Sequence, residues 1–267
     1  NVRKIYIIFL LCLMLLSACE MTLPKLASTT SADSILIERY DRVEARYLTT
    51  GDFAALQEMN TQYPTQTRAL IEDILKLGNV YESDINKRLL EFYQDSTLQN
   101  VIYASQSQYA DMSDITEELK RVFTNLQREI PELEIPKFYT QIGAFDQSIV
   151  VDDMSIGISL DKYLGKDFPS YLRFYDEQQR RSMTREYIVY DCLVFYLISQ
   201  YPLSGFDALS QHERDLYLGK FLWSANVITG KKMFVNDATR HIDVFMKKHK
   251  EFRIKDLMKM NDINLPI

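Results

Sequence analysis

The N-terminus carries the feature that most constrains this chain, an unbroken apolar run that ends just before a cysteine. The run covers residues 5–16, follows the basic pair Arg3-Lys4 and precedes Ser17-Ala18-Cys19. As a helix, twelve residues span about 18 Å, well short of the roughly 30 Å hydrocarbon core of a bilayer. This order of basic, apolar and small residues is instead typical of a bacterial secretion signal.

The small residues before Cys19 predict cleavage after Ala18 and attachment of lipid to the Cys19 thiol. We therefore expect three parts: a lipoprotein signal peptide at 1–18, a lipidated N-terminus and flexible tether at 19–33, and one globular domain at 34–267. Acyl chains such as palmitate would contribute about 0.8 kcal/mol per buried CH₂ to membrane binding. The predicted location is the cell envelope, on a membrane face outside the cytoplasm, with the inner and outer membranes both left open.

Charge and cysteine content exclude several classes of protein. The formal net charge is −6, and it becomes more negative when Arg3 and Lys4 leave with the signal. Nucleic-acid binding needs a basic face, so we expect no nucleic-acid partner. After loss of Cys12 and lipidation of Cys19, only Cys192 remains, which excludes an intrachain disulfide.

Hydrophobic spacing predicts helices over most of the chain and strands in one short segment. With 8 glycines in 267 residues, a turn-rich β-sandwich is disfavoured. The sequence predicts a single α+β domain, mostly helical with a small antiparallel sheet. Helices are expected from about residue 36, from residue 64 towards Gly78, at 85–93, from residue 113, and at 183–200, 210–228 and 237–250; strands are expected at 138–142, 148–151 and 154–160.

The chain contains no recognised catalytic motif. It has neither a phosphate-binding loop nor a complete Gly-x-Ser-x-Gly nucleophile elbow. The closest two of His212, His241 and His249 are eight residues apart, whereas a helical zinc site needs two histidines four apart. We therefore predict no catalytic residue, no metal and no cofactor. Cys192 lies in an apolar helix, where a core thiol is expected.

Asp191 is the most informative polar residue, because it interrupts a helix that is apolar almost all round. Burial of an unpaired charge is costly, so its carboxylate must face solvent, a cleft, or a partner such as arginine or a backbone amide. Tyr187 is expected one turn before Asp191 on the same face of the helix. Glu186 is expected to line up with Tyr190 on another face. Both a structural role and a ligand-facing cleft stay open; the candidate cleft residues are Asp161, Tyr163, Glu186, Tyr187 and Asp191.

Several sequence blocks resemble the GldB gliding-motility lipoproteins of Bacteroidetes. They are Pro136-Lys-Phe-Tyr-Thr140, Asp146-Gln-Ser-Ile-Val-Val151, Ile156-Gly-Ile-Ser-Leu-Asp-Lys-Tyr-Leu-Gly165 and Met183-Thr-Arg-Glu-Tyr-Ile-Val-Tyr-Asp191. The resemblance extends over about residues 35–250 and implies a zincin-like fold. Active zincins carry His-Glu-x-x-His, but Arg185-Glu-Tyr-Ile-Val189 has no histidine. The resemblance thus implies a peptidase-like fold that lacks the metal-binding motif, a pseudoenzyme.

The favoured hypothesis is a non-enzymatic envelope lipoprotein that binds other envelope proteins, similar to gliding-motility or secretion-machinery components. An edge strand of the hairpin at 147–160 is a possible binding surface. One alternative is a peptidase-like hydrolase that uses Glu186 or Asp191. Another is a glycan-binding lipoprotein, suggested by the 17 tyrosines. The sequence leaves the oligomeric state open.

Overall fold

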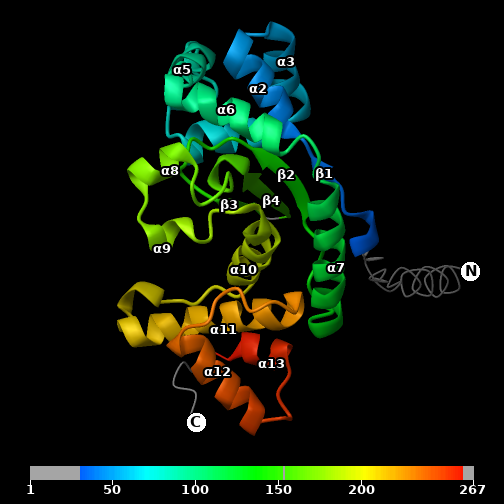
Figure 1. Ribbon diagram of the computed structural model, residues 1–267. Helices are drawn as coiled ribbons and strands as arrows, with labels where there is room; N and C mark the ends of the chain where they lie inside the picture. Colours follow the sequence, from blue (N-terminus) through cyan, green and yellow to red (C-terminus); the bar gives the residue numbers. More distant parts are fainter. Residues whose placement is uncertain (1–30, 153, 261–267) are drawn as a thin grey trace, which may run out of the picture.

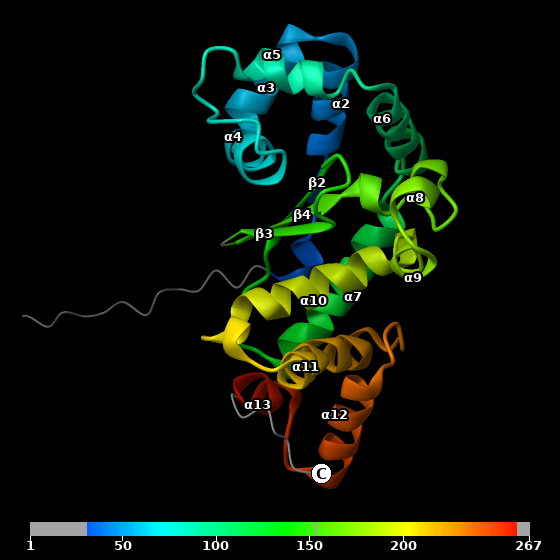
Figure 2. The same cartoon turned by 90° about the vertical axis from the view of Figure 1, so that its left-hand side faces the viewer.

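The computed structural model describes residues 31–152 and 154–260 as a small sheet between two groups of helices (Figures 1 and 2). The predicted signal peptide, the lipidation site Cys19 and most of the predicted tether lie outside the described residues. The last residues of that tether are ordered, because Ala32–Ser34 form a 3-10 turn, η1, in which Ala32 is buried. This turn contacts α7.

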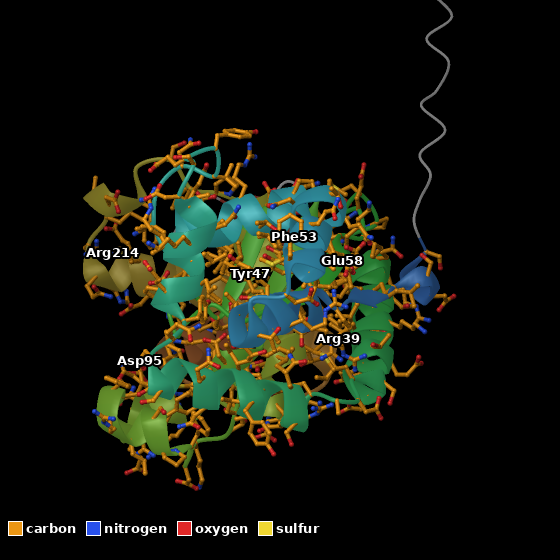
Figure 3. All side chains as sticks on the ribbon, turned by 90° about the horizontal axis from the view of Figure 1, so that it is seen from above. Arg39, Tyr47, Phe53, Glu58, Asp95 and Arg214 are labelled. Carbon is orange, nitrogen blue, oxygen red and sulfur yellow. The ribbon has the colours of Figure 1, made fainter. Side chains whose placement is uncertain are left out.

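Five helical segments above the sheet form a group that we call the upper helices. They are α2 (Tyr40–Thr50), α3 (Phe53–Gln62), α4 (Pro64–Arg68) with its π-helical continuation η2 (Ala69–Ile74), α5 (Ile85–Phe92) and α6 (Ser96–Gln108). Figure 3 looks down onto this group, with Tyr47 of α2 and Phe53 of α3 labelled. The Tyr47 hydroxyl donates to the carbonyl of Asn86 at 2.7 Å, which ties α2 to α5.

The remaining helices lie beside and below the sheet. Helix α7 runs along one flank, α8 and α9 lie on the opposite flank, and α10 passes under the sheet to reach α11, which α12 and α13 cover (Figure 1). Their bounds are α7 Ser113–Glu129, α8 Pro169–Phe174, α9 Glu177–Arg180, α10 Ile188–Gln200, α11 Gln211–Thr229, α12 Asp237–Lys248 and α13 Ile254–Lys259, with 3-10 turns η3 Leu160–Lys162, η4 Arg185–Tyr187 and η5 Phe206–Ala208.

The sheet of the described residues has four strands in the order β1-β2-β4-β3. Strand β1 (Ile37–Glu38) and strand β4 (Ser155–Ser159) both pair in parallel with β2 (Lys137–Gln141). Strand β3 (Ile149–Asp152) pairs antiparallel with β4 at the edge. The three strands predicted from the sequence are thus confirmed, with shifts of about one residue at their ends.

The prediction of a purely antiparallel sheet is wrong, because the sheet is mixed. Alternation of apolar and polar residues marks a strand without fixing the direction of its partner. Here the chain leaves β2, forms β3 at the edge, and returns as β4 beside β2 and parallel to it. The predicted start of the first helix, near Leu36, is also wrong. Leu36 is 75% exposed and precedes β1, and α2 begins only at Tyr40.

Close packing between β2 and β4 depends on a glycine. Gly157 lies directly opposite Tyr139 in the parallel register. A Cβ on Gly157 would come within 2.5 Å of the Tyr139 ring, far inside contact distance. Gly157 therefore makes room for a buried tyrosine, which explains the glycine in a segment that superficially resembles a nucleophile elbow.

Helix α10 is central and buried, as its apolar composition predicts. Cys192 is fully buried within it, and burial raises the pKa of that thiol well above its usual value. The α-helix begins later than predicted, at Ile188, because Arg185–Tyr187 form a 3-10 turn. That change alters how Glu186 and Tyr187 are placed relative to Asp191.

Candidate functional site

A pocket of about 270 Å³ opens beside the N-terminal end of α10, and we call it the Asp191 pocket. Its walls come from the start of β3, the η3 turn, the segment around α8 and α9, and α10. Two of the five predicted cleft residues, Tyr163 and Asp191, line it. The other lining residues were not predicted from the sequence: Ser148, Lys162, Tyr175, Gln179, Ser182 and Met183.

Asp191 and Tyr163 form the polar contact within this pocket. The Tyr163 hydroxyl donates to Oδ2 of Asp191 at 2.8 Å, and the Ser148 side chain hydrogen-bonds the same hydroxyl. Burial raises the pKa of Asp191 to about 7, although the hydrogen bond from Tyr163 opposes that rise. Burial and the Asp191 charge raise the pKa of Tyr163 well above its usual value, so Tyr163 remains a neutral donor.

The Asp191 carboxylate has no cationic partner among the described residues. No lysine or arginine of this part of the chain lies within the 4.0 Å that defines an ion pair. Lys162 lines the pocket, but its Nζ donates to the carbonyl of Phe145 and to the Tyr175 hydroxyl, each at 3.1 Å. Of the alternatives that the sequence left open for Asp191, the structure therefore shows a pocket-lining carboxylate whose hydrogen-bond partner is a tyrosine.

Asp161 is fully buried and supports the pocket from behind. Its two carboxylate oxygens accept N–H bonds from Gly143 at 2.8 Å and Phe145 at 2.6 Å. These bonds hold the loop after β2, where Ala144 and Phe145 have φ values of 51° and 68°. Left-handed backbone at two successive residues other than glycine is strained, so Asp161 fixes a loop that would otherwise relax.

Glu186 and Tyr187 lie away from the Asp191 pocket. Glu186 is exposed and lines a separate pocket beside α7, together with Arg185. Tyr187 packs its ring on Phe234 at a centroid distance of 5.7 Å and makes no hydrogen bond to Asp191. The five predicted residues therefore divide into a pocket pair, a supporting carboxylate and two residues outside the site.

Most of the chain, the Asp191 pocket included, matches a known protein family. The family model described as gliding motility protein GldB matches residues 24–232, which is most of the 267-residue chain. The chain belongs to the GldB family. The match includes every residue of the Asp191 pocket. No curated protein and no solved structure matched the chain, so the expected likeness to zincins stays a prediction.

Sequence reasoning missed two further buried carboxylates of this GldB-family chain, both on α2. Asp41 is fully buried and accepts two hydrogen bonds from the Arg39 guanidinium, at 2.8 and 2.9 Å. Glu44 accepts the N–H of Ile142 at 2.9 Å, and burial raises the pKa of Glu44 well above its usual value. Glu44 follows the buried Tyr40 by four residues and therefore lies on the same face of α2, which is the sequence signal that could have indicated its burial.

Glu44 holds a backbone N–H and Asp41 holds an arginine side chain, and neither belongs to a metal centre in the described part of the chain. Among residues 31–152 and 154–260, no group of three or more His, Cys, Asp or Glu side chains is arranged to hold a metal ion. His249, for example, stacks on Phe245 at a centroid distance of 4.3 Å. In the same part of this GldB-family chain, no helix combines the length and apolar character needed to span a bilayer.

Proposed function

We propose that this GldB-family protein is a lipid-anchored envelope component, attached through Cys19, that binds another envelope protein without catalysing a reaction. Family membership links the chain to gliding motility. The basic, apolar and small residues that precede Cys19 support the anchor. Membrane identity and the host cell's motility are left open by this proposal.

The Asp191 pocket is the binding site that supports this function best. Its carboxylate is poorly solvated, accepts a hydrogen bond from one neutral hydroxyl and has no cationic partner within residues 31–152 and 154–260. A lysine or arginine side chain from a partner would supply the missing charge and hold the carboxylate ionised. The half-buried carboxylate without a cation among the described residues is the single observation that carries the proposal, because a poorly solvated charge without a counter-ion is unfavourable in the isolated protein.

The geometry favours neither hydrolase residue. Glu186 and Asp191 line different pockets, so they cannot act together as an acid–base pair. Among the described residues, neither pocket is lined by a histidine or by a nucleophilic serine or cysteine, other than Ser148 and Ser182 beside Asp191. Stoichiometric zinc in the purified protein, or peptide hydrolysis that is lost in Glu186→Gln, would contradict a non-enzymatic role.

Site-specific photo-crosslinking in intact cells tests the proposed interaction. A photoreactive phenylalanine at Gln179, an exposed lining residue, is expected to give a discrete adduct with an envelope protein. The same group at Tyr103, which is 77% exposed on α6 and outside the pocket, is the matched control. Asp191→Ala should lower the adduct yield from Gln179 about tenfold or more, because a lost ion pair of about 1.4 kcal/mol changes binding tenfold. An equal yield in Asp191→Ala would refute the pocket as the binding site.

Fractionation tests the anchor separately. Wild type should sediment with membranes, whereas Cys19→Ala should lose labelling by a clickable fatty acid. Fatty-acid labelling that persists in Cys19→Ala would contradict lipidation at this residue, whatever the result of crosslinking.

A further inference from the structure

A braced loop between η2 and α5, residues 75–84, forms one wall of a second pocket. Three side chains hold its backbone: Glu72 accepts an N–H at 2.8 Å, Glu82 accepts another at 2.7 Å, and Arg88 donates to a carbonyl at 2.7 Å. Gly78 within the loop has a φ of 143°, and a Cβ there would lie 2.8 Å from Arg88. The loop therefore has one well-defined conformation although it lies at the surface.

This loop presents a single large aromatic side chain to solvent. Tyr81 is 86% exposed, while Leu75, Leu77 and Val80 of the same loop pack against the core. The Tyr81 N–H donates to the Asn79 side chain at 2.9 Å, which fixes the backbone from which the ring projects. A rigid loop with one exposed ring suits ligand binding, because little conformational entropy is lost on contact.

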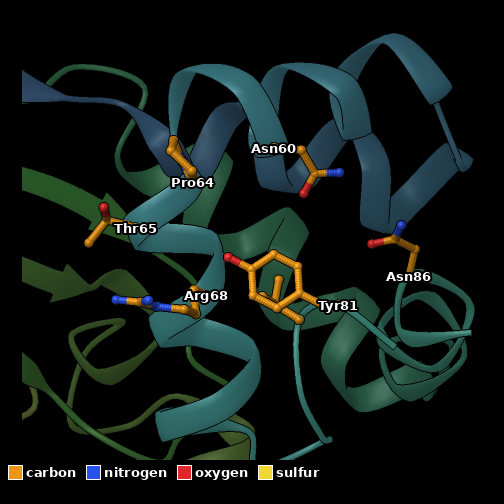
Figure 4. Close-up of a pocket in the computed structure, with 7 residues that line it drawn as sticks. Asn60, Pro64, Thr65, Arg68, Tyr81 and Asn86 are labelled. Carbon is orange, nitrogen blue, oxygen red and sulfur yellow. The ribbon is translucent and has the colours of Figure 1, made fainter. Parts of the chain in front are cut away.

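The ring borders a pocket of about 370 Å³ whose other walls come from three helices; we call it the Tyr81 pocket. Figure 4 shows the Tyr81 ring between α4 and Asn86, with Asn60 of α3 above it. None of the lining polar side chains forms a hydrogen bond or ion pair with the described residues. These side chains are Asn60, Thr65, Arg68 and Asn86, and the Tyr81 hydroxyl is likewise unpaired.

This composition matches the chemistry of a sugar. A pyranose ring has C–H groups that can lie on an aromatic face and hydroxyls that both donate and accept hydrogen bonds, as amide side chains do. Arg68 is a free guanidinium in the pocket wall, so a carboxylate on the sugar would form a bidentate pair with it. A peptide is disfavoured, because only Pro64 and Val80 add apolar lining and no strand edge lines this pocket.

We propose that the Tyr81 pocket binds a carboxylate-bearing saccharide, with the Tyr81 ring as the stacking surface and Arg68 as the carboxylate ligand. Asn60 and Asn86 flank the ring and would bond to sugar hydroxyls. The pocket volume is within the range of sites for small ligands, roughly 300–1,000 Å³, and fits one or two sugar rings. This site shares no residue with the Asp191 pocket and stands independently of the interaction proposed there.

Calorimetric titration of the purified full chain with trigalacturonate and trimannuronate tests the proposal. At least one of these uronates is expected to bind with a Kd of about 1 mM or tighter, and its methyl ester about tenfold more weakly. Tyr81→Ala should weaken binding at least about tenfold, whereas Tyr81→Phe, which keeps the ring, should stay within about threefold of wild type. Arg68→Gln should reduce the preference for the acid over the ester.

Two controls separate this site from the rest of the molecule. Tyr103→Ala removes an equally exposed tyrosine outside the pocket, and Asp191→Asn alters the other site; both should bind the uronate as wild type does. Circular dichroism checks that Tyr81→Ala remains folded. Absence of saturable binding to both uronates, unchanged affinity in Tyr81→Ala, or equal affinity for acid and ester would each overturn the proposal.

Discussion

Replacement of Asp191 by asparagine should stabilise this protein at neutral pH and leave it nearly unchanged in acid. Asparagine has almost the same shape and can still accept the hydrogen bond from Tyr163. It removes only the charge, and the structure shows that this charge is desolvated and lacks a cation. The effect on the free energy of unfolding must therefore depend on pH.

The direction follows from the pKa of Asp191, which burial raises from 3.8 to about 7. A raised carboxyl pKa contributes stability that is fully present below about pH 4 and is lost as pH rises through about 7. Each pKa unit corresponds to about 1.4 kcal/mol, so the full loss is about 4 kcal/mol. Because one side of the carboxylate meets water in the pocket, we expect roughly half of this, about 2 kcal/mol.

Urea denaturation of wild type and Asp191→Asn at pH 4, 6 and 8 measures the effect, provided that the m values agree. The two free energies of unfolding should be similar at pH 4 and should differ by about 2 kcal/mol at pH 8, with the variant more stable. Glu186→Gln, an exposed carboxylate outside the pocket, is the matched control and should follow wild type. A constant difference between wild type and Asp191→Asn from pH 4 to 8 would refute the reasoning.

Three further substitutions test other parts of the structure. Asp161→Ala leaves two buried N–H groups unpaired, so the free energy of unfolding should fall by about 3 kcal/mol or more in urea titrations; an unchanged midpoint would contradict its supporting role. Gly157→Ala should destabilise by about 1–3 kcal/mol through collision with Tyr139, and the added change Tyr139→Leu should recover part of that loss in thermal unfolding. Burial lowers the pKa of Lys220 from 10.5 to about 8, so the stability that the neutral amine contributes is lost as pH falls from about 10.5 through 8. The free energy of unfolding of Lys220→Met should therefore exceed that of wild type by about 2 kcal/mol at pH 7, and the difference should disappear above about pH 10.

The helices and strands with strong periodicity could be predicted from the sequence. Helix α7 was predicted to open at Ser113 with its stripe of apolar residues, and that stripe is buried. Helix α11 was also predicted within about one residue at each end. By contrast, α3 and α6 were missed, because each buries only three residues and so shows a short apolar pattern. The parallel pairing of β2 with β4 was missed because side-chain alternation does not encode strand direction.

The candidate site could be predicted only at the residue whose charge interrupts the apolar pattern of its helix. Asp191 stands out because a carboxylate within an apolar helix violates the local pattern, and the structure places it in a pocket. Tyr163 was among the candidate cleft residues, but its hydrogen bond to Asp191 joins residues 28 apart in sequence and no local pattern indicates it. Tyr81 gave no signal, since its exposure depends on side chains that hold the loop from both ends.

The position of η1 has a consequence for how the protein would be oriented. The described chain begins beside α7, on the flank opposite α8 and α9 (Figure 1). About twelve residues of sequence separate Cys19 from this point. The anchor proposed at Cys19 would therefore join the described residues on the α7 flank. The Asp191 pocket has walls from the segment around α8 and α9, on the other flank, so a partner could bind there without contacting the side at which the proposed anchor joins.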